Sequence, residues 1–158
     1  MTSAELAATM IRQHEGLRLT VYDDKTGEPI VPGYTVRGHA TVGYGTRLDN
    51  GGITEAEAQA LLAERLHVAK CDARDYVGGL TWSRLDPARQ AVLIDMAYKL
   101  GGPRLGGFVQ MRYALEALDF DCAAEEMLAS LWADQVGDRA QALAAVMVSG
   151  QMPEEIQI

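Results

Sequence analysis

The spacing of hydrophobic and polar positions divides the chain into a short helix, a turn-rich β region and a long helical remainder. Thr2 and Glu5 match a capping box, and apolar residues follow at helical spacing, which predicts a first helix. Gly16 predicts that this helix ends at about Glu15, because glycine commonly terminates helices. Between residues 18 and 50, apolar positions alternate with polar ones among many glycines and prolines, which predicts two or three short strands.

The rest of the chain has helical spacing. Thr54 and Glu57 form a second capping box that opens a helix over residues 54–77, ending before Gly78. At about 23 residues, this helix would be roughly 35 Å long, enough to span a small domain. Asp86 and the proline after it predict the start of another helix. The further helices are predicted at 87–100, 108–118, 120–131 and 136–149.

These elements predict an α+β fold in which a small β lobe is joined by a long helix to a mainly helical C-terminal lobe. A length of 158 residues fits one domain, and 48% hydrophobic with 23% charged residues is typical of soluble globular proteins. We expect a single domain over residues 1–158. Its parts are a β lobe at 16–53, a connecting helix at 54–77, and a helical lobe at 80–150 that also takes in residues 1–15.

The charge balance excludes several classes of partner. Lys and Arg number 14 against 22 Asp and Glu, a net charge of −8, which argues against nucleic-acid binding and against attachment to anionic membranes. The only cysteines, Cys71 and Cys122, are far apart and lack the spacing of metal ligands, so we expect no metal, no cofactor and no disulfide framework.

No part of the chain has the apolar length of a membrane span, and the first residues lack the basic start and apolar run of a signal peptide. We therefore expect a protein that is made in the cytoplasm and stays there unaided, without membrane insertion.

The candidate chemistry lies around the end of the first helix. Glu15 stands at the helix end, Asp23 and Asp24 follow in a predicted turn, and a glycine-rich strand follows at residues 41–45. A pair of carboxylates is what glycoside hydrolysis needs, because one group must donate a proton to the leaving oxygen while the other stays charged. The pattern therefore favours a glycosidase site.

Two stretches carry a family resemblance: the run EGLRL at 15–19, with Tyr22, Asp24 and Gly27 after it, and the run TVGYG at 41–45. Together they closely resemble the phage lysozymes of glycoside hydrolase family 24. The resemblance continues in the helical part, at residues 85–86, 93–96, 107–108 and 132–140, so it covers nearly the whole chain in register. It implies a lysozyme-like fold.

The resemblance also implies catalytic positions. Glu15 matches the general acid, Asp24 matches the second carboxylate, and Thr41 matches the threonine that helps hold the attacking water. Arg139 matches a buried arginine that pairs with the carboxylate of the acid. The implied reaction is hydrolysis of the β-1,4 bond between N-acetylmuramic acid and N-acetylglucosamine in the glycan strands of bacterial peptidoglycan.

Some positions depart from the family. Residues 28–40 stand where shorter members have only a few, and we expect a longer β-hairpin that either widens the sugar cleft or is a neutral insertion. Thr46 replaces a frequent histidine, and we expect His39 to be a surface residue rather than its substitute. Asp23 occupies a variable position, so Asp23→Asn is expected to behave like the wild type.

Positions that line the sugar groove of the family match only loosely here. They are Gly45, Arg47, Tyr98, Lys99 and Met111. For Tyr98, core packing is favoured over stacking on a sugar, and Trp132 is likewise expected to anchor the core.

Two other functions stay open beside hydrolysis with inversion. A lytic transglycosylase needs only one glutamate, so Asp24 and Thr41 speak against it. A non-catalytic peptidoglycan-binding protein is disfavoured because it has no need of Glu15, Asp24, Thr41 and Arg139 together. Its best support is the net charge of −8, because peptidoglycan is anionic and wall-degrading enzymes are commonly basic. The resemblance implies a monomeric endolysin that leaves the host cytoplasm through a membrane-permeabilising partner such as a holin, or that is carried in a virion.

Overall fold

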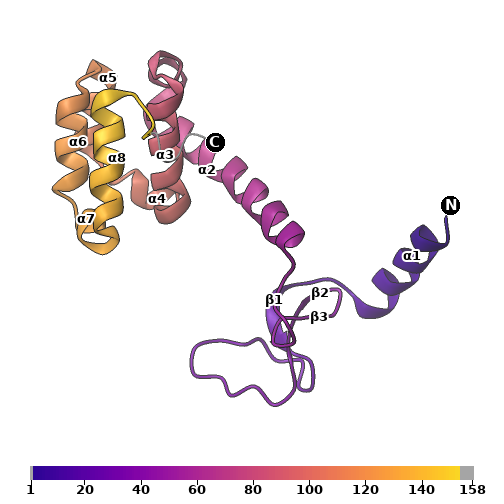
Figure 1. Ribbon diagram of the computed structural model, residues 1–158. Coiled ribbons are helices and arrows are strands. Elements are labelled where there is room, and N and C mark those ends of the chain that lie inside the picture. The colour runs from indigo at the N-terminus through magenta and orange to yellow at the C-terminus, as the bar shows by residue number, and fades with distance from the viewer. Residues whose placement is uncertain (1, 154–158) are drawn as a thin grey trace. The chain divides into compact units, whose positions relative to one another are not determined.

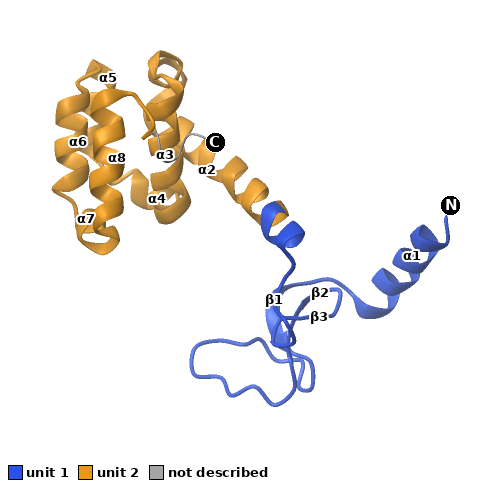
Figure 2. Ribbon diagram, viewed as in Figure 1, with its two compact units in different colours: residues 1–59 blue, residues 60–158 orange. Residues whose placement is uncertain are grey.

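The computed structural model describes residues 2–153 and contains two compact units, residues 1–59 and residues 60–158 (Figure 2). Unit 1 holds a helix and a three-stranded antiparallel sheet, and the described part of unit 2 is helical. The predicted α+β, lysozyme-like fold is confirmed. The grouping of residues 1–15 with the helical lobe in a single domain stays a prediction.

Helix α1 (Ser3–Glu15) begins and ends where the sequence predicts. The backbone N–H of Glu5 donates to Thr2 Oγ1 at 3.3 Å, and the Thr2 N–H donates to the Glu5 carboxylate at 2.6 Å, so the capping box is present. Gly16 leaves the helical conformation at φ 67° and ψ 159°, and its N–H still donates to Arg12 O. The chain therefore turns sharply and leaves Glu15 at the tip of the helix.

The sheet has the order β1-β2-β3, formed by Arg18–Asp23, Ala40–Gly43 and Thr46–Arg47. Tyr22 lies opposite Thr41, and Thr41 lies opposite Arg47, so Thr41 sits in the central strand. Beyond β1 the chain forms a long loop before it returns as β2 (Figure 1). Apart from an isolated bridge between Tyr22 and Pro29, the loop adds no strand. The expected longer hairpin is therefore present as β1, β2 and the long connection between them.

Helix α2 (Glu55–Arg84) is longer than predicted and is kinked. Its capping box forms as expected, because the Thr54 N–H donates to the Glu57 carboxylate at 2.7 Å and the Glu57 N–H donates to Thr54 Oγ1 at 3.3 Å. Gly78 departs from helical geometry at φ 78°, ψ 152°, after which the helix resumes. The sequence thus predicted the interruption at Gly78 but not that the helix continues from there to Arg84.

The helices that follow α2 pack around one core. They are α3 (Pro87–Leu100), α4 (Gly102–Leu105), α5 (Val109–Ala117), α6 (Phe120–Leu128), α7 (Leu131–Val136) and α8 (Asp138–Ser149). Leu93, Met96, Leu115 and Met147 are among the fully buried side chains. The helices predicted at 87–100 and 108–118 are confirmed; the short α4 was not predicted, and Ser130 starts α7 as a separate helix.

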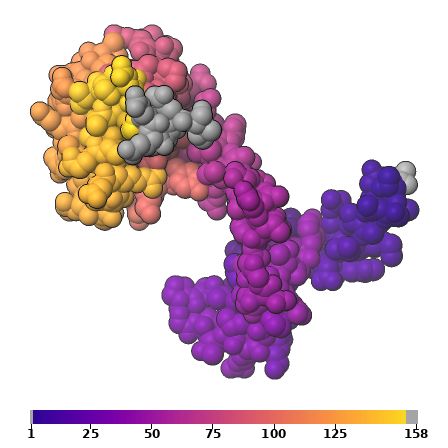
Figure 3. Space-filling view, in the orientation of Figure 1, coloured from indigo at the N-terminus to yellow at the C-terminus, as the bar shows by residue number. Residues whose placement is uncertain are grey.

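The early part of α2 is exposed up to Val68 (Figure 3), and burial starts at Ala69 and Ala73. Of the apolar positions that predicted this helix, only the second half therefore packs into the core of unit 2. Among the described residues, every helix is too short or too polar to cross a membrane.

Candidate active site

The predicted acid, Glu15, lies against the turn between β2 and β3. Its side chain is exposed, and a Cβ atom built on Gly45 would lie 3.4 Å from Glu15 Oε2. Gly45 also has a φ of +88°, which L side chains rarely adopt. Glycine at position 45 therefore serves both the turn and the close approach of the carboxylate.

The predicted second carboxylate, Asp24, immediately follows β1 and is fixed at both oxygens. Its Oδ1 accepts the backbone N–H of His39 at 2.7 Å, and its Oδ2 lies 3.3 Å from the Arg47 guanidinium. Its own N–H donates to His39 O at 3.0 Å. The carboxylate is thus held between the end of the loop and β3, with part of its surface exposed.

Both candidate carboxylates therefore meet the short segment Gly45–Arg47. Glu15 packs on its first residue, and Asp24 forms an ion pair with its last residue. These contacts all lie within unit 1, so they depend on the packing of one compact body. The segment brings together a helix tip and a strand end that are nine residues apart in the sequence.

Asp23 faces away from solvent and organises the loop. Its side chain is 0% exposed. The hydrogen bonds from the loop, chiefly from the Arg37 N–H, hold the pKa of this carboxyl below its usual value, although burial acts in the opposite direction. The donors to Asp23 are the backbone N–H groups of Arg37 (2.6 Å), Gly38 (3.0 Å) and Lys25 (3.0 Å), and the Tyr34 hydroxyl (3.2 Å).

The expectation that Asp23 is a variable position, at which asparagine would behave like the wild type, is wrong. A buried carboxylate that accepts four hydrogen bonds is a structural anchor. Sequence alone gave no sign of it, because the donors lie up to fifteen residues further along the chain. Gly38 fits closely here, since a Cβ on it would lie 2.8 Å from Asp23 Oδ1 and would also clash with Asp24.

Thr41 is 2% exposed in β2. Its hydroxyl donates to His39 O at 3.1 Å. Because a hydroxyl has one proton, its oxygen then has only acceptor capacity left. Thr41 and Asp24 consequently contact the same residue, His39.

Arg139, the predicted supporting residue, lies at the start of α8 and pairs with Asp95 of α3. Its Nε donates to Asp95 Oδ1 at 3.1 Å and its Nη2 to Oδ2 at 2.6 Å, a bidentate arrangement that raises the pKa of the guanidinium. The arginine side chain is 47% exposed within this pair. Its pairing with Glu15 stays a prediction, since the two residues belong to different units.

The loosely matched groove positions fall into distinct environments. Gly45 and Arg47 contact the candidate carboxylates, as described. Tyr98 and Lys99 are exposed near the end of α3, so the expected core packing of Tyr98 is wrong; at 46% exposure its ring is open to solvent. Met111 has 0% exposure and packs in the core of unit 2.

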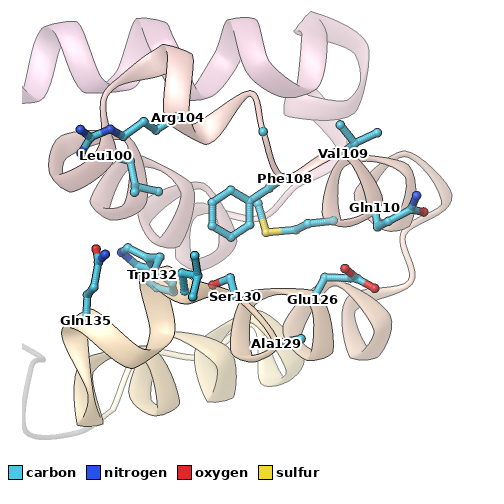
Figure 4. Close-up of a pocket in the computed structure, with 13 residues that line it drawn as sticks. Leu100, Arg104, Phe108, Val109, Gln110, Glu126, Ala129, Ser130, Trp132 and Gln135 are labelled. Atoms are coloured by element: carbon cyan, nitrogen blue, oxygen red, sulfur yellow. The ribbon is translucent and has the colours of Figure 1, made fainter.

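A separate pocket of about 600 Å³ lies within unit 2 (Figure 4). Phe108 and Trp132 meet edge to face in its wall, with ring centroids 6.4 Å apart. Trp132 is buried, as expected of a core anchor, yet its indole N–H has no hydrogen-bond partner among the described residues. Glu126 and Gln135 are the acidic and amide side chains among the residues that line this pocket.

Among residues 2–153 there is no group of three His, Cys, Asp or Glu side chains placed to hold a metal ion.

Comparison with known proteins places this architecture in a family. The chain is 29% identical over 160 residues to the pre-baseplate central spike protein Gp5 of Enterobacteria phage T4, an alignment that covers 92% of this chain. The chain spans only 28% of the length of that protein. The model of the phage lysozyme family matches residues 12–145, which include Glu15, Asp24, Thr41 and Arg139. The chain therefore belongs to the phage lysozyme family.

Proposed function

We propose that this chain hydrolyses the β-1,4 bond between N-acetylmuramic acid and N-acetylglucosamine in peptidoglycan, with Glu15 as general acid and with Asp24 and Thr41 positioning or activating water. Membership of the phage lysozyme family supports a lysozyme-like, peptidoglycan-degrading function. The assignment of the bond and of the residues is our proposal.

The observation that carries the proposal is the approach of Glu15 and Asp24 to one segment, Gly45–Arg47. Glycoside hydrolysis needs a proton donor and a charged carboxylate on either side of the scissile bond. Glu15 is exposed at a helix tip, where a sugar can reach it, and Asp24 is fixed by His39 and Arg47. The difference in their environments favours different roles for the two carboxyl groups.

The side chains of Asp24 and Thr41 favour hydrolysis by water over lytic transglycosylation. Asp24 provides a carboxylate that accepts a proton, and the Thr41 oxygen can accept a second hydrogen bond from the same water. A transglycosylase needs neither group. We propose inversion at the anomeric carbon, which corresponds to carboxyl groups roughly 6.5–9.5 Å apart, with a water between sugar and base.

The remaining parts of the proposal concern support and delivery. Arg139 is proposed to support the acid, and Tyr98 and Lys99 to line the sugar groove. We propose that the protein acts as a monomer on glycan strands, reaching them from the host cytoplasm with a membrane-permeabilising partner such as a holin, or within a virion. The similarity to a phage central spike protein favours the virion.

The test is to incubate isolated sacculi with the wild type, Glu15→Gln and, as a matched control, Glu64→Gln, which changes an exposed glutamate of α2. We expect reducing muramic acid ends with the wild type and with Glu64→Gln, and a rate at least about a hundredfold lower with Glu15→Gln. Ends in the 1,6-anhydro form would instead show transglycosylation. Binding to sacculi without release of sugar would show a non-catalytic protein.

A further inference from the structure

We infer that His39 is a positioning residue of this reaction: its backbone joins Asp24 to Thr41, and its imidazole ties that junction to Asp49. The inference rests on the proposed function, since it concerns the two residues proposed to hold water. It gives a role to a side chain that the sequence predicts to be an ordinary surface histidine.

The first observation is the number of bonds that converge on the His39 backbone. Its N–H donates to Asp24 Oδ1 at 2.7 Å, and its carbonyl accepts the Asp24 N–H at 3.0 Å. The same carbonyl accepts the Thr41 hydroxyl at 3.1 Å. The loop delivers His39 beside β1, so one residue fixes both the backbone and the carboxylate of Asp24 and the rotamer of Thr41.

These bonds also decide how a water molecule would be oriented. The Thr41 proton is committed to His39 O, so the Thr41 oxygen acts as an acceptor, and Asp24 is an acceptor as a carboxylate. A water that contacts both must donate one hydrogen to each. Its lone pairs are then left free to face the substrate. When the water attacks, its oxygen bonds to the anomeric carbon while the bond from that carbon to the glycosidic oxygen breaks. Asp24 takes one proton of the water, and the leaving glycosidic oxygen takes the proton of Glu15.

The second observation is the anchoring of the His39 side chain. Its Nδ1 lies 3.1 Å from Asp49 Oδ2 and 3.3 Å from Oδ1. Asp49 belongs to the segment just after β3, where Arg47 pairs with Asp24 and the Leu48 N–H donates to Ala40 O at 2.7 Å. Three consecutive residues, 47–49, thus hold the strand end, the carboxylate and the histidine in one arrangement.

The pair His39–Asp49 is exposed, at 45% and 40% of the two side chains. Exposed pairs contribute little to global stability, so its removal should leave the fold intact. The reaction rate is more sensitive than stability to the loss of this pair, because misplacing a reacting group by about 1 Å lowers the rate on the order of a hundredfold. The pair is therefore expected to matter for turnover more than for folding.

The experiment compares kcat, KM and Tm for the wild type, His39→Gln, Asp49→Asn and the double variant on solubilised peptidoglycan. His67→Gln, an exposed histidine of α2, is the control. We expect each single variant to lower kcat about tenfold or more, within the range set by misplacement, while KM and Tm hardly change. The double variant should be no worse than the single ones, because both remove the same pair.

The inference is overturned if His39→Gln and Asp49→Asn keep kcat within about twofold of the wild type. It is also overturned if kcat falls only together with Tm, or if the losses of kcat in the two single variants add up in the double variant. Failure of the proposed function has a different appearance. In that case the wild type itself, like Glu15→Gln, releases no muramic acid ends, whereas here the wild type and His67→Gln remain active.

Discussion

At the scale of single residues, two adjacent aspartates have different environments. Asp24 keeps part of its carboxylate exposed beside Arg47, whereas Asp23 is buried under the loop. We expect Asp24→Asn to lower turnover by about a hundredfold or more, because an amide cannot accept the proton of water. The loop should keep its structure, as judged by the backbone amide resonances of Arg37 and Gly38.

Asp23→Asn should act through structure instead. Both oxygens of Asp23 accept hydrogen bonds, so an amide NH₂ in place of either would face donors. We expect the amide resonances of Arg37 and Gly38 to shift and the loop to become sensitive to protease. A variant with an unchanged loop and lost turnover would show that Asp23, not Asp24, acts on the substrate.

The same hydrogen bonds predict how the loop responds to acid. The folded state holds the pKa of Asp23 below its usual value, so the contribution of the carboxylate is fully present above that value. It is lost as the pH falls below the usual value and through the lower, folded pKa. We expect the Gly38 amide resonance to move in that acidic window in the wild type but to stay constant in Asp23→Asn. Movement near neutral pH would contradict the assignment.

At the scale of elements, the sequence predicted what is locally determined. Three helices begin where the sequence predicts, after the capping residues Thr2, Thr54 and Asp86. Each of these side chains accepts a hydrogen bond from a backbone N–H only three residues further along the chain. The internal conformation of the loop after β1 was not predicted, because it depends on Asp23, whose partners lie far along the chain. The two candidate carboxylates were found from the motif, whereas the roles of Asp23 and His39 depend on contacts that no spacing shows.

The kink in α2 gives a prediction for stability. Gly78 has φ 78° and ψ 152°, and nothing lies within 4 Å of a Cβ built there, so alanine would be strained by its backbone rather than by a clash. We expect Gly78→Ala to lower stability by about 1–3 kcal/mol. The neighbouring Gly79→Ala is the control and should be neutral or stabilising by up to about 1 kcal/mol, because that glycine is helical. Equal thermal unfolding curves for the two variants would contradict the kink.

The ends of α3 and α8 are joined by Arg89. Its Nε and Nη2 donate to the carbonyls of Met147 (2.7 Å) and Val148 (2.6 Å), and its Nη1 pairs with the helix cap Asp86. The guanidinium also lies 3.7 Å from the ring centroid of Phe120. It therefore satisfies carbonyls at the end of α8 that have no partner inside the helix.

We expect Arg89→Ala to lower the free energy of unfolding by about 2–3 kcal/mol, the range for hydrogen bonds to charged groups that are mostly buried. Arg89→Lys should be intermediate, since an ammonium keeps the charge but not the planar fork. Chemical denaturation measures both. Arg65→Ala, in the exposed part of α2, is the control and should unfold like the wild type.

At the scale of the whole molecule, charge conflicts with the proposed substrate. The net charge is −8, and peptidoglycan is anionic. The excess of acidic over basic side chains is small in residues 1–53, which have five basic and six acidic side chains. Most of the negative charge lies in residues 54–158. The candidate carboxylates thus lie in the part of the chain that repels an anionic wall least.

This distribution predicts an unusual salt dependence. Salt screens exposed charges beyond a Debye length of about 10 Å at 0.1 M, so moderate salt should weaken the repulsion between protein and wall. We expect turnover of isolated sacculi to rise with added salt before it falls at high salt. In Asp121→Asn combined with Glu125→Gln, which removes two exposed negative charges from α6, the maximum should move to lower salt. A rate that declines steadily from the lowest salt concentration would mean that attraction between the basic groups of unit 1 and the wall outweighs the net charge.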